Sequence, residues 1–166
     1  EVAATPLQMA NLAALIGTEG TQYHPHLVRA VRPSGREEMP VPSEIAHQVS
    51  APASFWSGVK SSMIDVVEHG TATKAKIPGL VWAGKTGSAE HGRKKEGDTH
   101  SWFIGFAPAT NPQIAICVLI EKGGHGGEAS APVAAEIVKR YFSKAASKAP
   151  SALVADAARS ASPEAR

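Results

Sequence analysis

The 166-residue sequence contains a single cysteine, only 5% aromatic residues and no long apolar segment. One cysteine permits no disulfide within the chain, and the apolar neighbours of Cys117 predict a buried structural thiol rather than a nucleophile. The longest apolar run, residues 114–120, is far short of the ~20 residues that a membrane-spanning helix needs. Because the sequence also lacks an initiator methionine and an N-terminal leader, we expect it to be a fragment of a longer protein.

The charge balance is also modest, with 17 basic and 15 acidic residues and a formal net charge of +2. No stripe of lysine and arginine with interleaved aromatic residues is present, so we expect no nucleic-acid partner. The one basic run, Arg93 to Lys95, is flanked by acidic residues and is interpreted as a solvated loop tip. His24 and His26 have no accompanying cysteine or carboxylate at ligand spacing, and we expect neither a metal nor a cofactor.

The apolar spacing predicts three helices. The first begins at a capping box formed by Thr5 and Gln8 and ends at Gly17. The second covers Ala53 to Glu68, and its inward face is formed by Phe55, Val59, Met63, Val66 and Val67. The third covers residues 131–142, with Val133, Ile137, Val138 and Tyr141 turned inward. From Ser143 the composition of alanine, serine, lysine and proline predicts a disordered tail over residues 143–166, after a domain of residues 1–142.

Strand patterns occupy the middle of the chain. A short strand is predicted over residues 27–31, followed by a polar turn region over residues 32–42. Three stronger strands are predicted over residues 80–90, 101–107 and 114–121, and the tight link after residue 107 indicates a hairpin. Residues 122–127 are glycine-rich and predict a flexible loop. The fold class is therefore α+β, with helices packed against an antiparallel sheet.

The most informative motif is Lys85-Thr86-Gly87 at the end of an apolar strand. Lys-Thr-Gly on a strand is one of three motifs, with S-x-x-K and S-x-N, that active-site serine enzymes use on β-lactams and related peptides. Further segments follow in order, namely Thr5-Pro-Leu-Gln-Met-Ala-Asn11, His69-Gly-Thr-Ala72, Ala83-Gly-Lys-Thr-Gly-Ser-Ala89, Trp102-Phe-Ile-Gly-Phe-Ala-Pro108 and Ala131-Pro-Val133. Over residues 1–142 this ordered set resembles the C-terminal half of the transpeptidase domain of class B penicillin-binding proteins. The Gly-Gly-His-Gly-Gly loop most resembles penicillin-binding protein 2, the cell-elongation type.

The resemblance implies a role for each residue of the motif. Lys85 would be catalytic, supplying a fixed cation for a substrate carboxylate and for proton handling at the serine. Thr86 would add a hydroxyl donor, Gly87 would let the substrate backbone approach, and the backbone N–H of Ser88 would contribute to an oxyanion hole. Strict alternation places Lys85 on the strand face opposite Thr86 and Ser88. His100 and His125 would border the site.

The other two motifs of the set are missing. Ser57-Gly-Val-Lys60 matches S-x-x-K literally, but it falls in the middle of the second helix, and we expect both side chains to face solvent. The only asparagines, Asn11 and Asn111, do not follow a serine at the spacing of S-x-N. We therefore predict that the fragment cannot be acylated by the family mechanism.

The resemblance implies a serine D,D-transpeptidase that crosslinks peptidoglycan stem peptides ending in D-Ala-D-Ala and is acylated by β-lactams. It further implies an anchor upstream of this chain, a catalytic domain on the outer face of the cytoplasmic membrane, and partners in the cell-wall elongation complex. A related D-alanyl-D-alanine carboxypeptidase or β-lactamase would pass the acyl group to water instead. A third alternative is a non-catalytic β-lactam sensor or a scaffold of the wall-synthesis complex.

Overall fold

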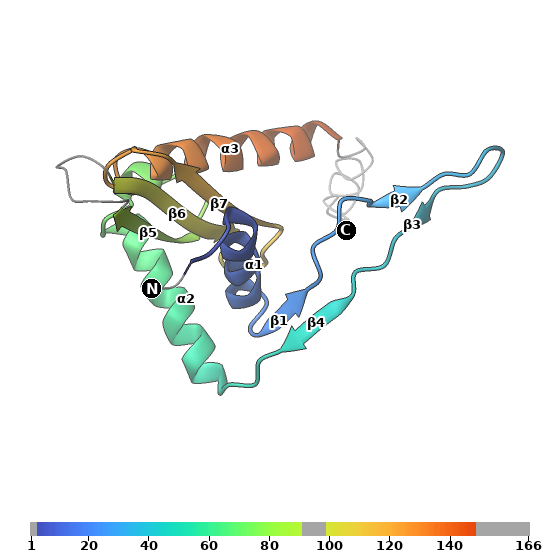
Figure 1. Ribbon diagram of the computed structural model, residues 1–166, viewed down its shortest axis with the longest axis horizontal. Helices are drawn as coiled ribbons and strands as arrows, with labels where there is room; N and C mark the ends of the chain where they lie inside the picture. Colours follow the sequence, from blue (N-terminus) through green and yellow to red (C-terminus); the bar gives the residue numbers. More distant parts are fainter. Residues whose placement is uncertain (1–2, 91–98, 149–166) are drawn as a thin grey trace, which may run out of the picture.

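The centre of the molecule is a three-stranded antiparallel sheet in the order β5-β6-β7 (Figure 1). This computed structural model describes residues 3–90 and 99–148. The strands are β5 (Ala83–Glu90), β6 (Thr99–Ala107) and β7 (Ile114–Ile120). The predicted hairpin between β6 and β7 is confirmed, and Gln113 N–H donates to the Ala107 carbonyl at 2.8 Å in its turn. The loop tip predicted at Arg93 to Lys95 lies outside the described residues.

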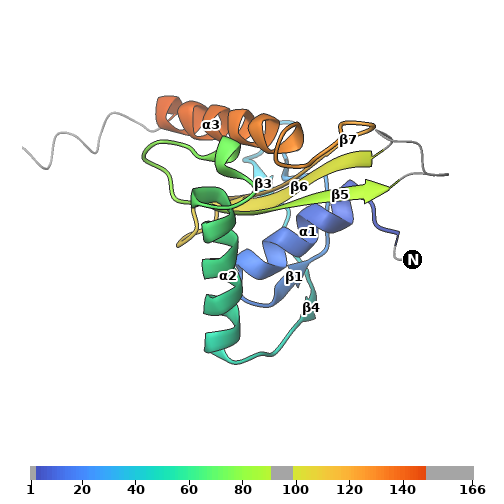
Figure 2. The ribbon, with the colours of Figure 1, turned by 90° about the vertical axis from the view of Figure 1, so that its left-hand side faces the viewer.

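Helices cover both faces of this sheet, as the α+β prediction requires (Figure 2). α1 (Pro6–Gly17) and α2 (Ala53–Glu68) lie on one face, and α3 (Ser130–Lys148) lies on the other. Alternate β6 residues supply the two cores, with Phe103 packed toward α3 and Phe106 toward α1 and α2. A short 3-10 helix, η1 (Thr73–Ala75), follows α2 and joins the α3 side of the core.

The predicted start of α1 is confirmed in detail. The Thr5 hydroxyl accepts from the Gln8 backbone N–H at 3.2 Å, and the Gln8 side chain accepts from the Thr5 N–H at 2.8 Å. Pro6 occupies the first turn, where its missing N–H costs no hydrogen bond. These reciprocal bonds satisfy donors that a helix N-terminus otherwise leaves open.

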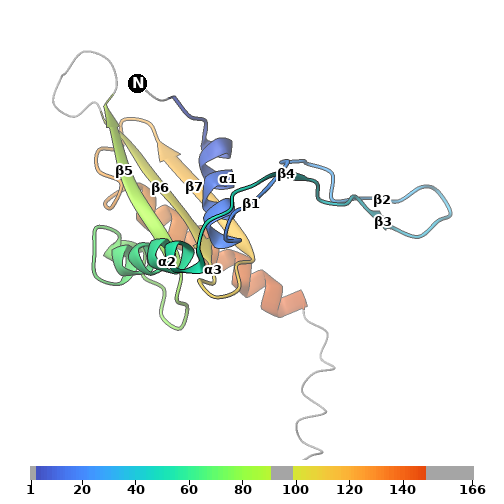
Figure 3. The same cartoon turned by 90° about the horizontal axis from the view of Figure 1, so that it is seen from below.

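Between α1 and α2 the chain makes a long arm that projects from the body (Figures 1 and 3). Two antiparallel ribbons form it, the first from β1 (Thr21–Tyr23) and β4 (Ile45–Gln48), the second from β2 (Ala30–Val31) and β3 (Met39–Pro40). The predicted strand over residues 27–31 is thus reduced to two residues, and the predicted polar turn region contains β3. Pairing across the arm, rather than a local alternating pattern, decides where these strands lie.

α2 has the predicted bounds, and its predicted inward face is confirmed except in the first turn. Trp56, Met63 and Val67 are buried, whereas Phe55, predicted to point inward, is 52% exposed. The first turns of α2 extend past the sheet (Figure 2), and the ring of Trp56 there lies against Gly20 at the start of the arm. A contact outside the sheet therefore shifts the buried stripe by one residue at this end of the helix.

α3 also differs from its prediction in length and orientation. It continues to Lys148, so residues 143–148 are helical rather than part of a disordered tail, and residues 149–166 lie outside the described residues. The buried positions are the small residues Ala131, Ala134 and Ala135, together with Val138. Of the predicted inward set, only Val138 is buried, and the others remain 40–45% exposed, namely Val133, Ile137 and Tyr141. Alanines face the sheet because they let the helix axis approach it closely.

Within the described residues, no helix is both long and apolar enough to cross a membrane.

Candidate functional site

The Lys-Thr-Gly segment lies on β5, which forms one edge of the sheet within the described part of the chain. In the register of the sheet, Lys85 stands opposite Ile104 of β6 and Thr86 opposite Phe103. Since Phe103 packs toward α3, Thr86 lies on that face, and Lys85 lies on the face of α1 and α2. The alternation predicted from the sequence is therefore what the sheet shows.

A hollow of about 280 Å³ runs along the Lys85 face of β5. Its lining comes from β5, β6 and the start of α1, namely Ala4, Met9, Lys85, Thr86, Gly87, Ser88, Ala89, Trp102 and Ile104. Lys85 is exposed, and its ammonium group donates to the Thr86 carbonyl oxygen at 2.8 Å. The hollow thus presents a cation and an open strand edge, which suit an extended peptide that carries a negative charge.

On the opposite face, the hydroxyl of Thr86 meets a second hydroxyl that sequence reasoning missed. Thr71 Oγ1 and Thr86 Oγ1 are 2.7 Å apart. Thr71 belongs to the turn that leaves α2, within the His69-Gly-Thr-Ala72 segment, whose only signal in the sequence is its resemblance to the family. Nothing in the local sequence indicates this pairing, because the two residues are 15 positions apart and belong to different elements.

The glycine-rich loop between β7 and α3 packs directly on the same strand. A Cβ atom at Gly126 would lie 2.6 Å from the Gly87 carbonyl oxygen, and one at Gly127 would overlap the Thr71 carbonyl. Glycine at these two positions therefore permits contact between backbones. The loop was predicted to be flexible, but it is tied to the sheet, since Gly124 N–H donates to the Thr99 carbonyl at 3.0 Å.

Two buried serines bind this loop through hydrogen bonds to its backbone. Ser101 of β6 and Ser130 at the start of α3 are fully buried, and their hydroxyl oxygens are 2.9 Å apart. The Ser130 hydroxyl donates to the Gly126 carbonyl at 3.0 Å, and the Ser130 N–H donates to Ser101 Oγ at 3.1 Å. An ion pair between Lys74 and Glu128 adds a link to η1. The loop position is therefore fixed by polar contacts from three elements.

The two predicted rim histidines lie at the same end of the sheet, one on β6 and the other in the loop between β7 and α3. His100 on β6 stands opposite Ala89 on β5, and its Nδ1 accepts from the Lys122 N–H at 3.1 Å. His125 is exposed, and its carbonyl accepts from Ser101 Oγ at 3.2 Å, immediately before the glycine that rests on Gly87. Neither imidazole lines the hollow beside Lys85, so their place at a substrate rim stays a prediction.

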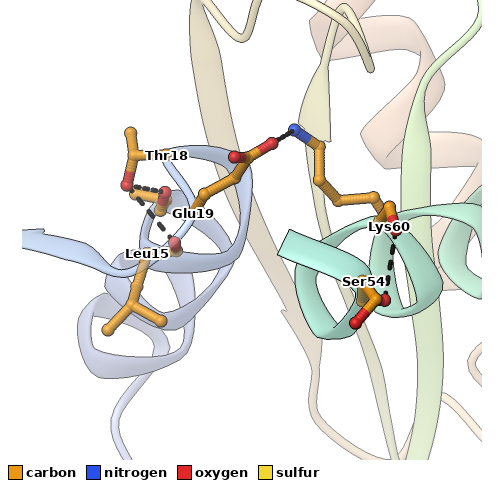
Figure 4. Close-up of polar contacts among 7 residues, drawn as sticks. Leu15, Thr18, Glu19, Ser54 and Lys60 are labelled. Carbon is orange, nitrogen blue, oxygen red and sulfur yellow. Dashed lines mark hydrogen bonds and ion pairs between the residues drawn. The ribbon is translucent and has the colours of Figure 1, made fainter. Parts of the chain in front are cut away.

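The S-x-x-K match in α2 does not form a nucleophile–lysine pair. Ser57 is exposed, as predicted, and its hydroxyl donates to the Ser54 carbonyl at 3.1 Å. Lys60 was predicted to face solvent, but its side chain is only 16% exposed, and its Nζ lies 2.9 Å from a Glu19 carboxylate oxygen (Figure 4). Because Lys60 is engaged with the end of α1, it is not available to activate Ser57.

Other reactive groups are less suited to chemistry. Cys117 on β7 is partly buried, and desolvation raises the pKa of its thiol, which disfavours the nucleophilic thiolate. Within residues 3–90 and 99–148, no three histidine, cysteine or acidic side chains lie together as a metal site would require.

An exposed lysine followed by a half-buried threonine on the edge strand of an α+β sheet is the arrangement typical of active-site serine enzymes. Residues 2–139 match the family model of the penicillin-binding protein transpeptidase domain, and the chain therefore belongs to that family. This confirms the resemblance drawn from the ordered motifs.

Its relatives include proteins named peptidoglycan D,D-transpeptidase. PbpA of Mycolicibacterium smegmatis is 35% identical over 80% of this chain and 28% of its own length. MrdA of Acinetobacter baumannii is 33% identical over 76% of this chain and 21% of its own length. The chain thus spans under a third of the curated relatives it matches.

Solved structures show the same fold. The ceftriaxone acyl-enzyme complex of penicillin-binding protein A from M. tuberculosis superposes with a TM-score of 0.74 at 31% identity, over 83% of this chain and 32% of that one. PBP2 of Pseudomonas aeruginosa gives a TM-score of 0.63 at 33% identity, over 83% of this chain and 29% of that one. The matched segment is therefore one part of a larger structure in each case.

Proposed function

We propose that this chain is the C-terminal half of the transpeptidase domain of a serine D,D-transpeptidase that crosslinks peptidoglycan and is acylated by β-lactams. The observation that carries the proposal is the placement of Lys85 and Thr86 at an exposed sheet edge, beside a hollow that can take an extended peptide. The family match supports it, as do the relatives named D,D-transpeptidases.

In this proposal the residues of β5 bind the donor peptide. Lys85 contributes positive charge near the terminal carboxylate and at the reacting serine, and Thr86 donates its hydroxyl to the same carboxylate. Gly87 leaves room for the substrate backbone, which pairs with the strand edge. The backbone N–H of Ser88 stabilises negative charge on the carbonyl oxygen in the transition state.

The nucleophile comes from outside these 166 residues. Ser57 is hydrogen-bonded to its own helix, Lys60 is paired with Glu19, and the sequence contains no S-x-N. We infer that intact S-x-x-K and S-x-N motifs lie upstream in the full-length protein. The proposal includes an upstream membrane anchor, a domain on the outer face of the cytoplasmic membrane, and partners in the cell-wall elongation complex.

The test is acylation of the full-length protein by a fluorescent penicillin, followed by mass spectrometry of the labelled peptide. We expect one adduct on the serine of the upstream S-x-x-K motif. Incubation with a donor peptide ending in D-Ala-D-Ala and an acceptor amine should then give a crosslinked product. Hydrolysis alone would indicate a carboxypeptidase, and a stable adduct without any product would indicate a sensor.

The chain alone supplies the matching negative control. We predict that residues 1–166 form no covalent adduct with the same penicillin, because Ser57 of the S-x-x-K match is bonded to its own helix and Lys60 is paired with Glu19. Intact-protein mass spectrometry measures this directly. A stable adduct on Ser57 would show that the helix α2 match is a functional pair after all.

A further inference from the structure

The turn after α2 places a rigidly held hydroxyl behind the Lys-Thr-Gly strand. Immediately after Thr71, the Ala72 N–H donates to the Val66 carbonyl at 3.0 Å and so ties the turn to the C-terminal end of α2. Beyond it, Ala72 and Ala75 are fully buried, and the indole N–H of Trp82 donates to the Ala75 carbonyl at 3.0 Å. The Thr71 backbone therefore has little freedom to move relative to β5.

The loop between β7 and α3 adds a second restraint on the same residue. Gly127 rests against the Thr71 carbonyl, while its neighbour Gly126 rests against Gly87. The loop thus fills the space between the α2 turn and the strand. Lys74, three residues after Thr71, is paired with Glu128 of this loop. These contacts set the separation of the two threonine hydroxyls at 2.7 Å.

Each threonine hydroxyl has one proton to donate, so the direction of this hydrogen bond matters. When Thr71 donates to Thr86, the Thr86 proton is left for a third group. When Thr86 donates to Thr71, that proton is already used. An anion beside Thr86 favours the first direction, because a chain of two O–H donors that ends on a negative charge is polarised along its length.

We propose that Thr71 is a positioning residue that orients the Thr86 hydroxyl toward the carboxylate of the substrate or β-lactam. This inference rests on the proposed function. Thr71 does not itself touch the ligand in this arrangement, and it acts by fixing the rotamer and the proton direction of Thr86. Such a residue affects acylation only as long as Thr86 carries its hydroxyl.

The test is a double-mutant cycle in the full-length protein. Thr71→Val keeps the shape of the side chain and removes the hydroxyl, and Thr71→Ser keeps the hydroxyl. We expect Thr71→Val to lower the second-order rate constant of penicillin acylation about 5- to 10-fold, the size of one neutral hydrogen bond. Thr71→Ser should stay within about twofold of wild type, and Thr71→Val should have no further effect in a Thr86→Val background.

Thr73→Val is the matched control, since Thr73 is exposed two residues further on, at the start of η1. Thermal unfolding of every variant separates loss of fold from loss of orientation, and Thr71→Ser reports on the hydroxyl even if Thr71→Val unfolds. Equal rates for Thr71→Val and wild type would overturn the proposal, and so would the same loss in both Thr86 backgrounds. Absence of acylation in the wild-type protein would instead contradict the proposed function.

Discussion

Gly84 immediately precedes the lysine of the edge strand and lies against the ring of Phe103. A Cβ atom at this position would overlap that ring, and Phe103 is fully buried beside Trp82, with ring centroids 5.3 Å apart. The ring cannot move away without displacing the core under α3. We predict that Gly84→Ala destabilises the full-length protein by about 1–3 kcal/mol, the usual cost of overpacking, measured as a lower thermal midpoint.

Gly58→Ala is a control for which we expect the opposite change in stability. It lies in the interior of α2, and a Cβ atom there would meet nothing within 4 Å. Gly58→Ala removes backbone freedom from the unfolded chain, so it should stabilise by about 0.5–1 kcal/mol. A Gly84→Ala protein as stable as wild type would show that the strand can shift away from Phe103.

Lys85 offers a test of chemistry at the scale of one side chain. Its side chain is exposed and donates only one hydrogen bond that the structure records, so Lys85→Ala should leave the fold intact. We predict a loss of ~10²–10³ in the acylation rate of the full-length protein, as expected for one lost charge-assisted contact in a transition state. Lys139→Ala on α3 is the control, and near-normal labelling of Lys85→Ala would remove this lysine from the mechanism.

The candidate site could be predicted from sequence only where its residues are neighbours along the chain. Lys85, Thr86 and Gly87 were found because one strand carries all three. Thr71 was not, because its partner is reached through the fold, and the same is true of Ser101 and Ser130, which lie 29 positions apart. A hydroxyl that completes a site from another element leaves no local pattern.

The loop between β7 and α3 depends on the two buried serines as a unit. Ser130→Ala would remove the donor to the Gly126 carbonyl and leave Ser101 with one partner fewer in a fully buried position. We predict a loss of about 1–3 kcal/mol in stability. Amide hydrogen exchange in peptides covering residues 123–130 should rise, while α1 stays unchanged. Ser143→Ala, at an exposed site on the same helix, should alter neither quantity.

The helices show which part of an element the sequence determines. The start of α1 and both ends of α2 were predicted correctly, because caps and breakers are local signals. The buried face of α2 was predicted correctly except at Phe55, and the buried face of α3 was predicted wrongly except at Val138. Trp56 rather than Phe55 is buried, and alanines rather than Ile137 face the sheet, because the neighbouring elements choose the stripe that fits.

At the scale of the whole molecule, two apolar surfaces are left uncovered in the described chain, namely the free edge of β7 and the exposed stripe of α3. β7 pairs only with β6, so its other edge presents unpaired backbone groups along the run Ile114–Ile120. We expect a further strand from the upstream part of the domain to pair with this edge, as the family resemblance implies. We predict that the chain alone is poorly soluble and that co-expression of the upstream half of the domain restores solubility, measured by size-exclusion chromatography.

A substitution on α3 distinguishes the effect of the β7 edge on solubility from the effect of the exposed apolar stripe of α3. Ile137→Lys places a charge on that stripe, where Ile137 is 45% exposed, and leaves β7 untouched. We expect it to improve solubility less than the upstream half does. A compact monomer of the unaltered chain at micromolar concentration would contradict the prediction and would require another segment to cover the edge.

The arm between α1 and α2 ends in a turn that projects away from the sheet (Figures 1 and 3). A Cβ atom at Gly35 would have no neighbour within 4 Å, and the contacts that close the turn are local, namely the Arg36 N–H donating to the Pro33 carbonyl at 3.1 Å and an ion pair between Arg32 and Glu38 at 3.0 Å. Insertions are tolerated best where the backbone makes few contacts. A peptide epitope or a small fluorescent tag could therefore be carried at this tip, which would allow the protein to be followed in living cells while the strand edge is left unaltered.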